Sequence, residues 1–214
     1  MPGSIFSFVP ANGGSRAGTV SQQLSGALSE ALKSEGVGAT VLLADFESRS
    51  PSLWRTREPR RRLDGRTWGA FVSDHDGVDV LEAREVHPRQ LPQILDYARA
   101  KYPVVCADLA GAKEAHALAV LRASDGIFLV ADSNKASLAG VREKGAWLRS
   151  IDLGDRCGVL LERVPNGVDA SAVEELTGLP VSSLIENQKQ ICQFACWLAA
   201  NRDGRAAAHH ACAG

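Results

Sequence analysis

The first 36 residues constrain the fold of this chain more than any other stretch, because three different patterns follow one another there. Residues 4–10 form an apolar run with aromatic and β-branched side chains, which predicts a buried strand. Residues 11–19 carry glycines and small side chains. From about Thr19 apolar residues recur at helical spacing up to Gly36, a typical C-cap. A strand, a glycine-bearing loop and a helix N-terminus form the geometry that cradles phosphate, since free N–H groups and the helix dipole converge on an anion.

Further apolar runs alternate with amphipathic stretches along the rest of the chain. The apolar runs predict strands over residues 39–44, 78–83, 103–108, 126–131, 158–161 and 181–185. The stretches between them predict helices after Pro88 and over residues 113–122, 137–150, 170–177 and 189–201. This alternation is typical of an α/β protein with a doubly wound, mostly parallel sheet that has helices on both faces. We therefore expect a single domain over residues 1–204 and a flexible tail over residues 205–214, with ligands at the carboxyl ends of the strands.

Charge and hydropathy argue against two classes of protein. The net charge of −1 indicates no general attraction to nucleic acids or membranes. No apolar run is long enough to span a bilayer, and the N-terminus lacks the basic start and apolar core of a secretory signal. We therefore expect a cytoplasmic protein.

The five cysteines are odd in number and form no C-x-x-C motif. This usage favours buried free thiols in a reducing compartment over disulfides or a metal site. Cys192 and Cys196 are four residues apart in a predicted helix, so both could contact one metal ion, but no other ligands cluster with them. The adjacent His209 and His210 lie in the predicted tail.

Residues 48–76 differ in composition from the rest of the chain, with many Arg, Ser, Pro and Gly residues and little periodicity. They predict a long arginine-rich loop or insertion, a kind of segment that is often functional in a compact domain. Six arginines lie between residues 55 and 66, and the run Arg60, Arg61 and Arg62 favours an acidic protein surface as the partner. Anionic lipid, nucleic acid and a merely solvated loop are the alternatives.

Five stretches together resemble the MinD/ParA family of P-loop ATPases, including its CpaE/TadZ-like pilus-assembly members and the related bacterial tyrosine kinases. Residues 12–20 lie without a gap on the family's K-G-G-x-G-K-T-T-V loop, and residues 42–47 resemble its L-L-V-D-x-D segment. Residues 77–83, 102–109 and 125–137 resemble its G-L-x-V-L-P-A, Y-D-x-V-I-V-D-x and A-D-x-V-L-V-x-x-P-x-x-x-S segments. The match follows the order of elements through almost the whole chain.

The resemblance implies a MinD/ParA-type fold that binds ATP or ADP with Mg²⁺ and forms a homodimer. It assigns the water-orienting, catalytic position to Asp45 and the Mg²⁺ side to Asp108. The positions that would contact the nucleotide are Gly13, Gly14, Ser15, Arg16, Ala17, Gly18, Thr19 and Arg163. From the residues alone, Asp45 and Asp108 are equally well explained as strand-end carboxylates that cap neighbouring loops.

The loop departs from the family pattern at the positions that handle charge. The P-loop lysine falls on Ala17, the signature lysine on Asn12 and the Mg²⁺-binding hydroxyl on Gly18. The family's adenine-side N-R pair becomes Glu162 and Arg163. Since phosphoryl transfer relies on positioning and charge neutralisation, this degenerate Walker A loop predicts a pseudo-ATPase.

Three functions are compatible with these observations. The first is a non-hydrolysing scaffold or regulator in the localisation or assembly of a cell-surface apparatus such as a pilus. It would act through a homodimer or a protein partner, with or without a bound nucleotide. The second is an active or weak ATPase in which Arg16 or a partner's residue replaces the missing lysine. The third is a ParA-like nucleic-acid-binding partition module that uses the arginine-rich segment.

Overall fold

The computed structural model describes residues 2–13, 16–36, 40–47, 65–84 and 86–202. Within these ranges the strands are β1 (Ser4–Pro10), β2 (Val41–Asp45), β3 (Val72–His75), β4 (Val78–Glu82), β5 (Val104–Asp108), β6 (Gly126–Asp132), β7 (Cys157–Glu162) and β8 (Val181–Ile185). The α-helices are α1 (Ala17–Ser34), α2 (Gly65–Gly69), α3 (Leu91–Lys101), α4 (Glu114–Ala123), α5 (Lys135–Ser150), α6 (Ala170–Thr177) and α7 (Gln188–Ala200). The described strands all belong to one eight-stranded sheet.

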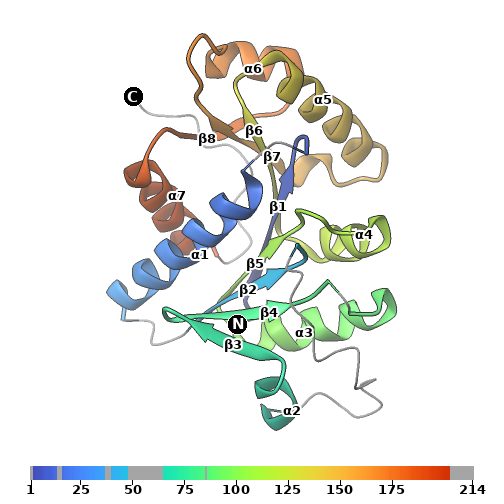
Figure 1. Ribbon diagram of the computed structural model, residues 1–214, viewed down its shortest axis with the longest axis vertical. Helices are drawn as coiled ribbons and strands as arrows, with labels where there is room; N and C mark the ends of the chain where they lie inside the picture. Colours follow the sequence, from blue (N-terminus) through green and yellow to red (C-terminus); the bar gives the residue numbers. More distant parts are fainter. Residues whose placement is uncertain (1, 14–15, 37–39, 48–64, 85, 203–214) are drawn as a thin grey trace.

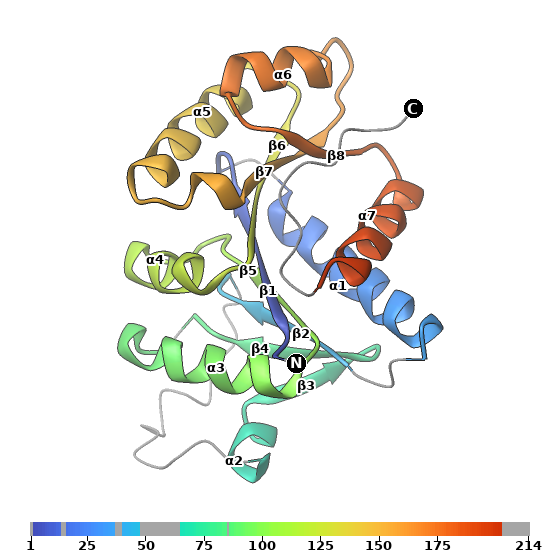
Figure 2. The same cartoon turned by 180° about the vertical axis from the view of Figure 1, so that it is seen from behind.

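This sheet is parallel except at one edge. Its strand order is β3-β4-β2-β5-β1-β6-β7-β8, and neighbouring strands run parallel except β3 and β4. Helices α1 and α7 cover one face, whereas α3, α4 and α5 cover the other (Figures 1 and 2). The structure therefore confirms the predicted α/β class with a doubly wound, mostly parallel sheet. None of the described helices is both long and apolar enough to cross a membrane.

The sheet separates two apolar layers, one on each face. Strands β1, β5, β6 and β7 are buried along nearly their whole length, which explains why their sequences are continuously apolar instead of alternating. On the α1 and α7 face, the ring of Phe128 stacks on that of Phe8 at 5.8 Å and meets that of Phe194 edge-on at 5.2 Å. These contacts join β1, β6 and α7 across the middle of the sheet.

Of the predicted arginine-rich loop or insertion over residues 48–76, the structure describes residues 65–76, and these contain α2 and β3. Trp68 of α2 is fully buried, and its indole N–H donates to the hydroxyl of Tyr102 at 2.9 Å. β3 and β4 form an antiparallel hairpin, and its two turn residues, Asp76 and Gly77, have positive φ angles of 54° and 81°. An Asp-Gly pair is a strong hairpin signal in a sequence, and it would have identified β3.

Besides two residues of the glycine loop, two predicted features lie outside the described residues. They are the arginines assigned to partner binding, Arg60, Arg61 and Arg62, and the tail over residues 205–214. Both stay predictions.

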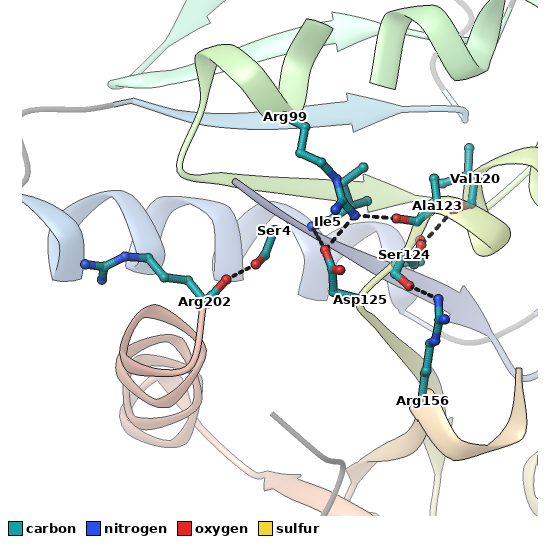
Figure 3. Close-up of polar contacts among 10 residues, drawn as sticks. Ser4, Ile5, Arg99, Val120, Ala123, Ser124, Asp125, Arg156 and Arg202 are labelled. Carbon is teal, nitrogen blue, oxygen red and sulfur yellow. Dashed lines mark hydrogen bonds and ion pairs between the residues drawn. The ribbon is translucent and has the colours of Figure 1, made fainter. Parts of the chain in front are cut away.

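Asp125 connects β1 to α3 and α4 at the amino-terminal edge of the sheet (Figure 3). Its Oδ2 accepts a hydrogen bond from the backbone N–H of Ile5 at 2.8 Å and pairs with Nη2 of Arg99 at 2.7 Å. The same arginine nitrogen donates to the carbonyl of Ala123 at 2.6 Å. Asp125 opens the segment that resembles the family's A-D-x-V-L-V strand, and its contacts give that residue a structural role.

Replacing Asp125 by alanine is expected to lower the free energy of unfolding by about 2 kcal/mol, because the N–H of Ile5 loses its acceptor and Arg99 loses its carboxylate partner. Urea denaturation followed by circular dichroism measures the difference. Asp96→Ala, at an exposed position of α3, is the matched control and should change the stability by less than about 0.5 kcal/mol. Equal losses in the two variants would show that the Asp125 contacts add no specific stability.

Candidate functional site

The predicted loop and the strand-end carboxylates meet at the carboxyl edge of the sheet, around the N-terminus of α1. β2, β5 and β1 are neighbours in the sheet, so the loops that follow them lie side by side. α1 begins at Ala17, two residues before the predicted start, and Arg16 at its N-cap makes no side-chain capping bond. Gly14 and Ser15 lie outside the described residues. The positions that the resemblance assigns to the lysine and to the Mg²⁺-binding hydroxyl, Ala17 and Gly18, are thus the first two residues of the helix.

The surroundings of these two positions are apolar at Ala17 and acidic at Gly18. The side chain of Ala17 is 0% exposed and belongs to the apolar layer between α1 and the sheet. A Cβ at Gly18 would lie 2.9 Å from Oε2 of Glu47 and 3.1 Å from Oδ2 of Asp108. The glycine therefore lets two carboxylates approach the first turn of the helix, where a threonine would have to displace them.

Asp45 and Asp108 each cap the loop that follows their own strand. Oδ1 of Asp45 accepts a hydrogen bond from the N–H of Glu47 at 2.7 Å, and Oδ1 of Asp108 accepts one from the N–H of Ala110 at 2.9 Å. The other oxygen of Asp108 accepts a hydrogen bond from the hydroxyl of Ser21 in α1 at 3.0 Å. The two backbone contacts are local Asx-type contacts, whereas the bond from Ser21 joins α1 to β5, and all three form without any ligand.

This part of the site is acidic, whereas an ATP site needs positive charge. Asp108 is 2% exposed and lies opposite Asp45 in the register of β5 and β2. Burial raises the pKa of Asp108 to about 6; the nearby carboxylates of Asp45 and Glu47 act in the same direction, and the hydrogen bonds from Ala110 and Ser21 oppose them. A phosphate group placed beside these carboxylates would be repelled.

The two arginines that the resemblance assigns to nucleotide binding form ion pairs with glutamates. Nη1 of Arg16 lies 3.5 Å from Oε1 of Glu162, and the Arg16 side chain is 64% exposed. Nη1 of Arg163 donates to Oε1 of Glu186 at 2.9 Å. All four residues line a cavity of about 270 Å³ at the ends of β7 and β8 and the start of α7. Arg16 is thus directed towards β7, on the side of β1 opposite to Asp108.

The described residues do not fit a triphosphate with Mg²⁺. Ala17 and Gly18 offer neither a cation nor a hydroxyl, and Arg16 pairs with Glu162 instead of replacing the lysine. Gly13 and Thr19 are exposed near the same edge. Within the part of the chain that the structure describes, no group of three or more His, Cys, Asp or Glu side chains has the geometry to hold a metal ion.

Sequence reasoning missed two residues of this site, Glu47 and Ser21. Glu47 ends the segment that resembles the family's L-L-V-D-x-D pattern, so its acidic side chain was visible there. Ser21 begins a row of buried serines at four-residue spacing, continued by Ser25 and Ser29, on an otherwise apolar face of α1. Polar residues repeated at helical spacing on a buried face indicate partners on the neighbouring sheet.

Solved structures of ParA and MinD proteins resemble this chain over most of its length. A ParA family ATPase from Chlorobium tepidum has a TM-score of 0.73 at 17% identity, with 94% of this chain and 93% of that chain covered. MinD from Pyrococcus horikoshii, complexed with Mg-ADP, has a TM-score of 0.62 at 19% identity, with 96% and 90% covered. The MinC:MinD complex from Aquifex aeolicus has a TM-score of 0.64 at 16% identity, with 91% and 85% covered.

No protein-family model matches this chain, and no curated protein matches it. At the identities given above, likeness to solved structures shows the fold alone. The chain has the MinD/ParA type of P-loop ATPase fold, as the resemblance of its sequence implied.

Proposed function

We propose that this chain is a non-hydrolysing scaffold or regulator of MinD/ParA type. The observation that carries the proposal is the start of α1, where Ala17 is buried and Gly18 lies against the carboxylates of Glu47 and Asp108. The resemblance to CpaE/TadZ-like proteins supports a role in the localisation or assembly of a cell-surface apparatus such as a pilus. A MinD of the same fold is known in complex with MinC, which supports action through a protein partner or a second copy.

The charges around the start of α1 oppose ATP hydrolysis. Phosphoryl transfer depends on cations and donors that neutralise the charge of the phosphates, and removing one such group from an enzyme typically lowers its rate by about 100- to 1,000-fold. This chain lacks both the lysine and the Mg²⁺-binding hydroxyl, and it places Asp45, Glu47 and Asp108 around the helix N-terminus. The free N–H groups of α1 do not offset these carboxylates, since the helix dipole acts as only about half an elementary charge.

Titration calorimetry with ATP and with ADP, each in the presence of Mg²⁺, tests the proposal. We expect no binding up to millimolar nucleotide and no phosphate release, because the site is negative where the phosphates would lie. Micromolar affinity together with turnover that Asp45→Ala abolishes would overturn the scaffold proposal in favour of an ATPase.

The variant Arg16→Ala distinguishes the scaffold proposal from the alternative of an ATPase in which Arg16 takes the role of the missing P-loop lysine. Since Arg16 pairs with Glu162 at 3.5 Å, we expect the variant to behave like the parent protein in the same titration. Circular dichroism would verify that the variant is folded.

A salt-dependent shift of DNA that disappears in the Arg60→Ser, Arg61→Ser, Arg62→Ser variant would instead support the partition module.

A further inference from the structure

Helix α7 carries two cysteines on its outer face. Cys192 and Cys196 are free and exposed, whereas Cys106 and Cys157 are free and buried in β5 and β7. The prediction of buried thiols is therefore confirmed for the strand cysteines and wrong for the helix pair. Free cysteine is among the most buried residue types, so two exposed thiols on one helix are unusual.

The two pairs of cysteines differ in what they can bind. Burial raises the pKa of both Cys106 and Cys157 to about 12, so these thiols stay protonated and closed to solvent. Metal ions bind the thiolate, and they reach a cysteine only from solvent. Cys192 and Cys196 are exposed, so metal ions in solution can reach them.

The spacing of the helix pair suits chelation better than a disulfide. Residues four apart on a helix have Cβ atoms about 5–6 Å apart, which is longer than the roughly 3.5–4.5 Å that a disulfide needs. Two thiolates on one tetrahedral zinc ion, each at about 2.3 Å, are roughly 3.8 Å from one another. In the structure Nε2 of Gln188 donates to Sγ of Cys192 at 3.9 Å, so this thiol has to leave Gln188 and turn towards Cys196 for the two sulfur atoms to reach that separation.

The surroundings show that the chain itself supplies half of such a site. The side chains of Ile191, Phe194 and Leu198 turn inward to the apolar layer, while Cys192 and Cys196 face outward. Among the residues that the structure describes, no third His, Cys, Asp or Glu joins them in a metal-binding group. Structural zinc sites have four protein ligands, so the remaining two must come from elsewhere.

We propose that Cys192 and Cys196 bind a thiophilic divalent cation, Zn²⁺ or Cd²⁺, together with the same two cysteines of a second copy. A two-fold axis through the ion brings the two α7 outer faces together and completes four thiolate ligands. Ala200, the next exposed position one turn beyond Cys196, has a small side chain. Each thiol releases its proton on binding, so affinity falls as the pH is lowered. This proposal does not depend on whether the chain binds a nucleotide.

Titration of the reduced chain with Cd²⁺ tests the site, because the ultraviolet thiolate-to-metal absorbance reports how much metal is bound. Light scattering after size exclusion gives the mass of the protein and hence its oligomeric state. We expect saturation at about one ion per two chains, with a dimer formed on metal addition and reversed by a chelator. Cys192→Ser and Cys196→Ser should each abolish both changes. Bound Cd²⁺ should also slow alkylation of these two thiols.

The matched control is a chain with His209→Ala, His210→Ala and Cys212→Ser, which removes the other potential ligands near the C-terminus. We expect it to bind Cd²⁺ and to dimerise like the parent chain. Loss of binding in this control, binding of one ion per chain without dimerisation, or unchanged binding in the Cys192→Ser and Cys196→Ser variants would each overturn the proposal. The substituted side chains are exposed or lie near the C-terminus, and circular dichroism verifies that each variant is folded.

Discussion

Replacing Gly140 by alanine is expected to destabilise the protein by about 2–3 kcal/mol, although alanine is the better helix former. A Cβ at Gly140 in α5 would lie 2.3 Å from the carbonyl oxygen of Ala11 and 3.1 Å from its carbonyl carbon. Both are backbone atoms, and the N–H of Ala11 is held by the carbonyl of Val130 at 2.9 Å. The loop therefore cannot move aside without losing a hydrogen bond, and α5 has to shift instead.

Gly26 in α1 is the matched control, since it is also a glycine inside a helix. A Cβ there would meet no heavy atom within 4 Å, so Gly26→Ala should stabilise the protein by about 0.5–1 kcal/mol. Urea denaturation of the two variants should give changes of opposite sign. A gain in stability for Gly140→Ala would show that α5 does not pack directly on the loop after β1.

Replacing Asp108 by asparagine is expected to stabilise the protein by about 2 kcal/mol at pH 8 and to have little effect at pH 4. Burial, helped by neighbouring carboxylates, raises the pKa of Asp108 from 3.8 to about 6 in the folded chain. The folded state therefore holds this proton more tightly than the unfolded state. The stability that it contributes is fully present below about pH 4 and is lost as the pH rises through about 6. Asparagine removes this loss because it stays neutral. Its oxygen keeps one of the two hydrogen bonds of Asp108, and the Ser21 hydroxyl retains the carbonyl of Gly18, 2.9 Å away, as an acceptor.

Urea denaturation at pH 4, 6 and 8 measures the effect. Asp74→Asn, at an exposed position of β3, is the control and should leave the pH dependence of the parent protein unchanged. The result also bears on function, because a cation bound at Asp108 would make its charge favourable. Asp108→Asn would then be destabilising at pH 8, and the proposal of a site without Mg²⁺ would fail.

Most helices and strands could be predicted, because the spacing of apolar residues within one element shows which of its side chains are buried. The strand over residues 181–185 and the helix over residues 170–177 have the predicted bounds, and α1 begins two residues before the predicted start. The hairpin strand β3 was missed, because three of its four residues are exposed and its pattern carries little apolar periodicity. Only the Asp-Gly turn marked it.

The candidate site could be predicted in part. Asp45 and Asp108 were expected at one edge of the sheet, since parallel strands end at the same edge, and the structure places them opposite each other. The partners of Arg16 and Arg163 could not be predicted, because Glu162 and Glu186 approach them from other strand ends. The exposure of the α7 thiols could have been predicted, because Ile191, Phe194 and Leu198 recur at helical spacing and leave Cys192 and Cys196 outside that apolar stripe.

The sequence by itself determined the α/β class, the order of the elements and the loss of the family's lysine and hydroxyl at Ala17 and Gly18. Each is a property of neighbouring residues, through periodicity or through residue identity at a motif position. Only the tertiary structure decided what took their place: Glu47 and Asp108 close on Gly18, and Arg16 turns to Glu162. These contacts join residues far apart in the chain, and they depend on strand order and register, which local patterns do not encode.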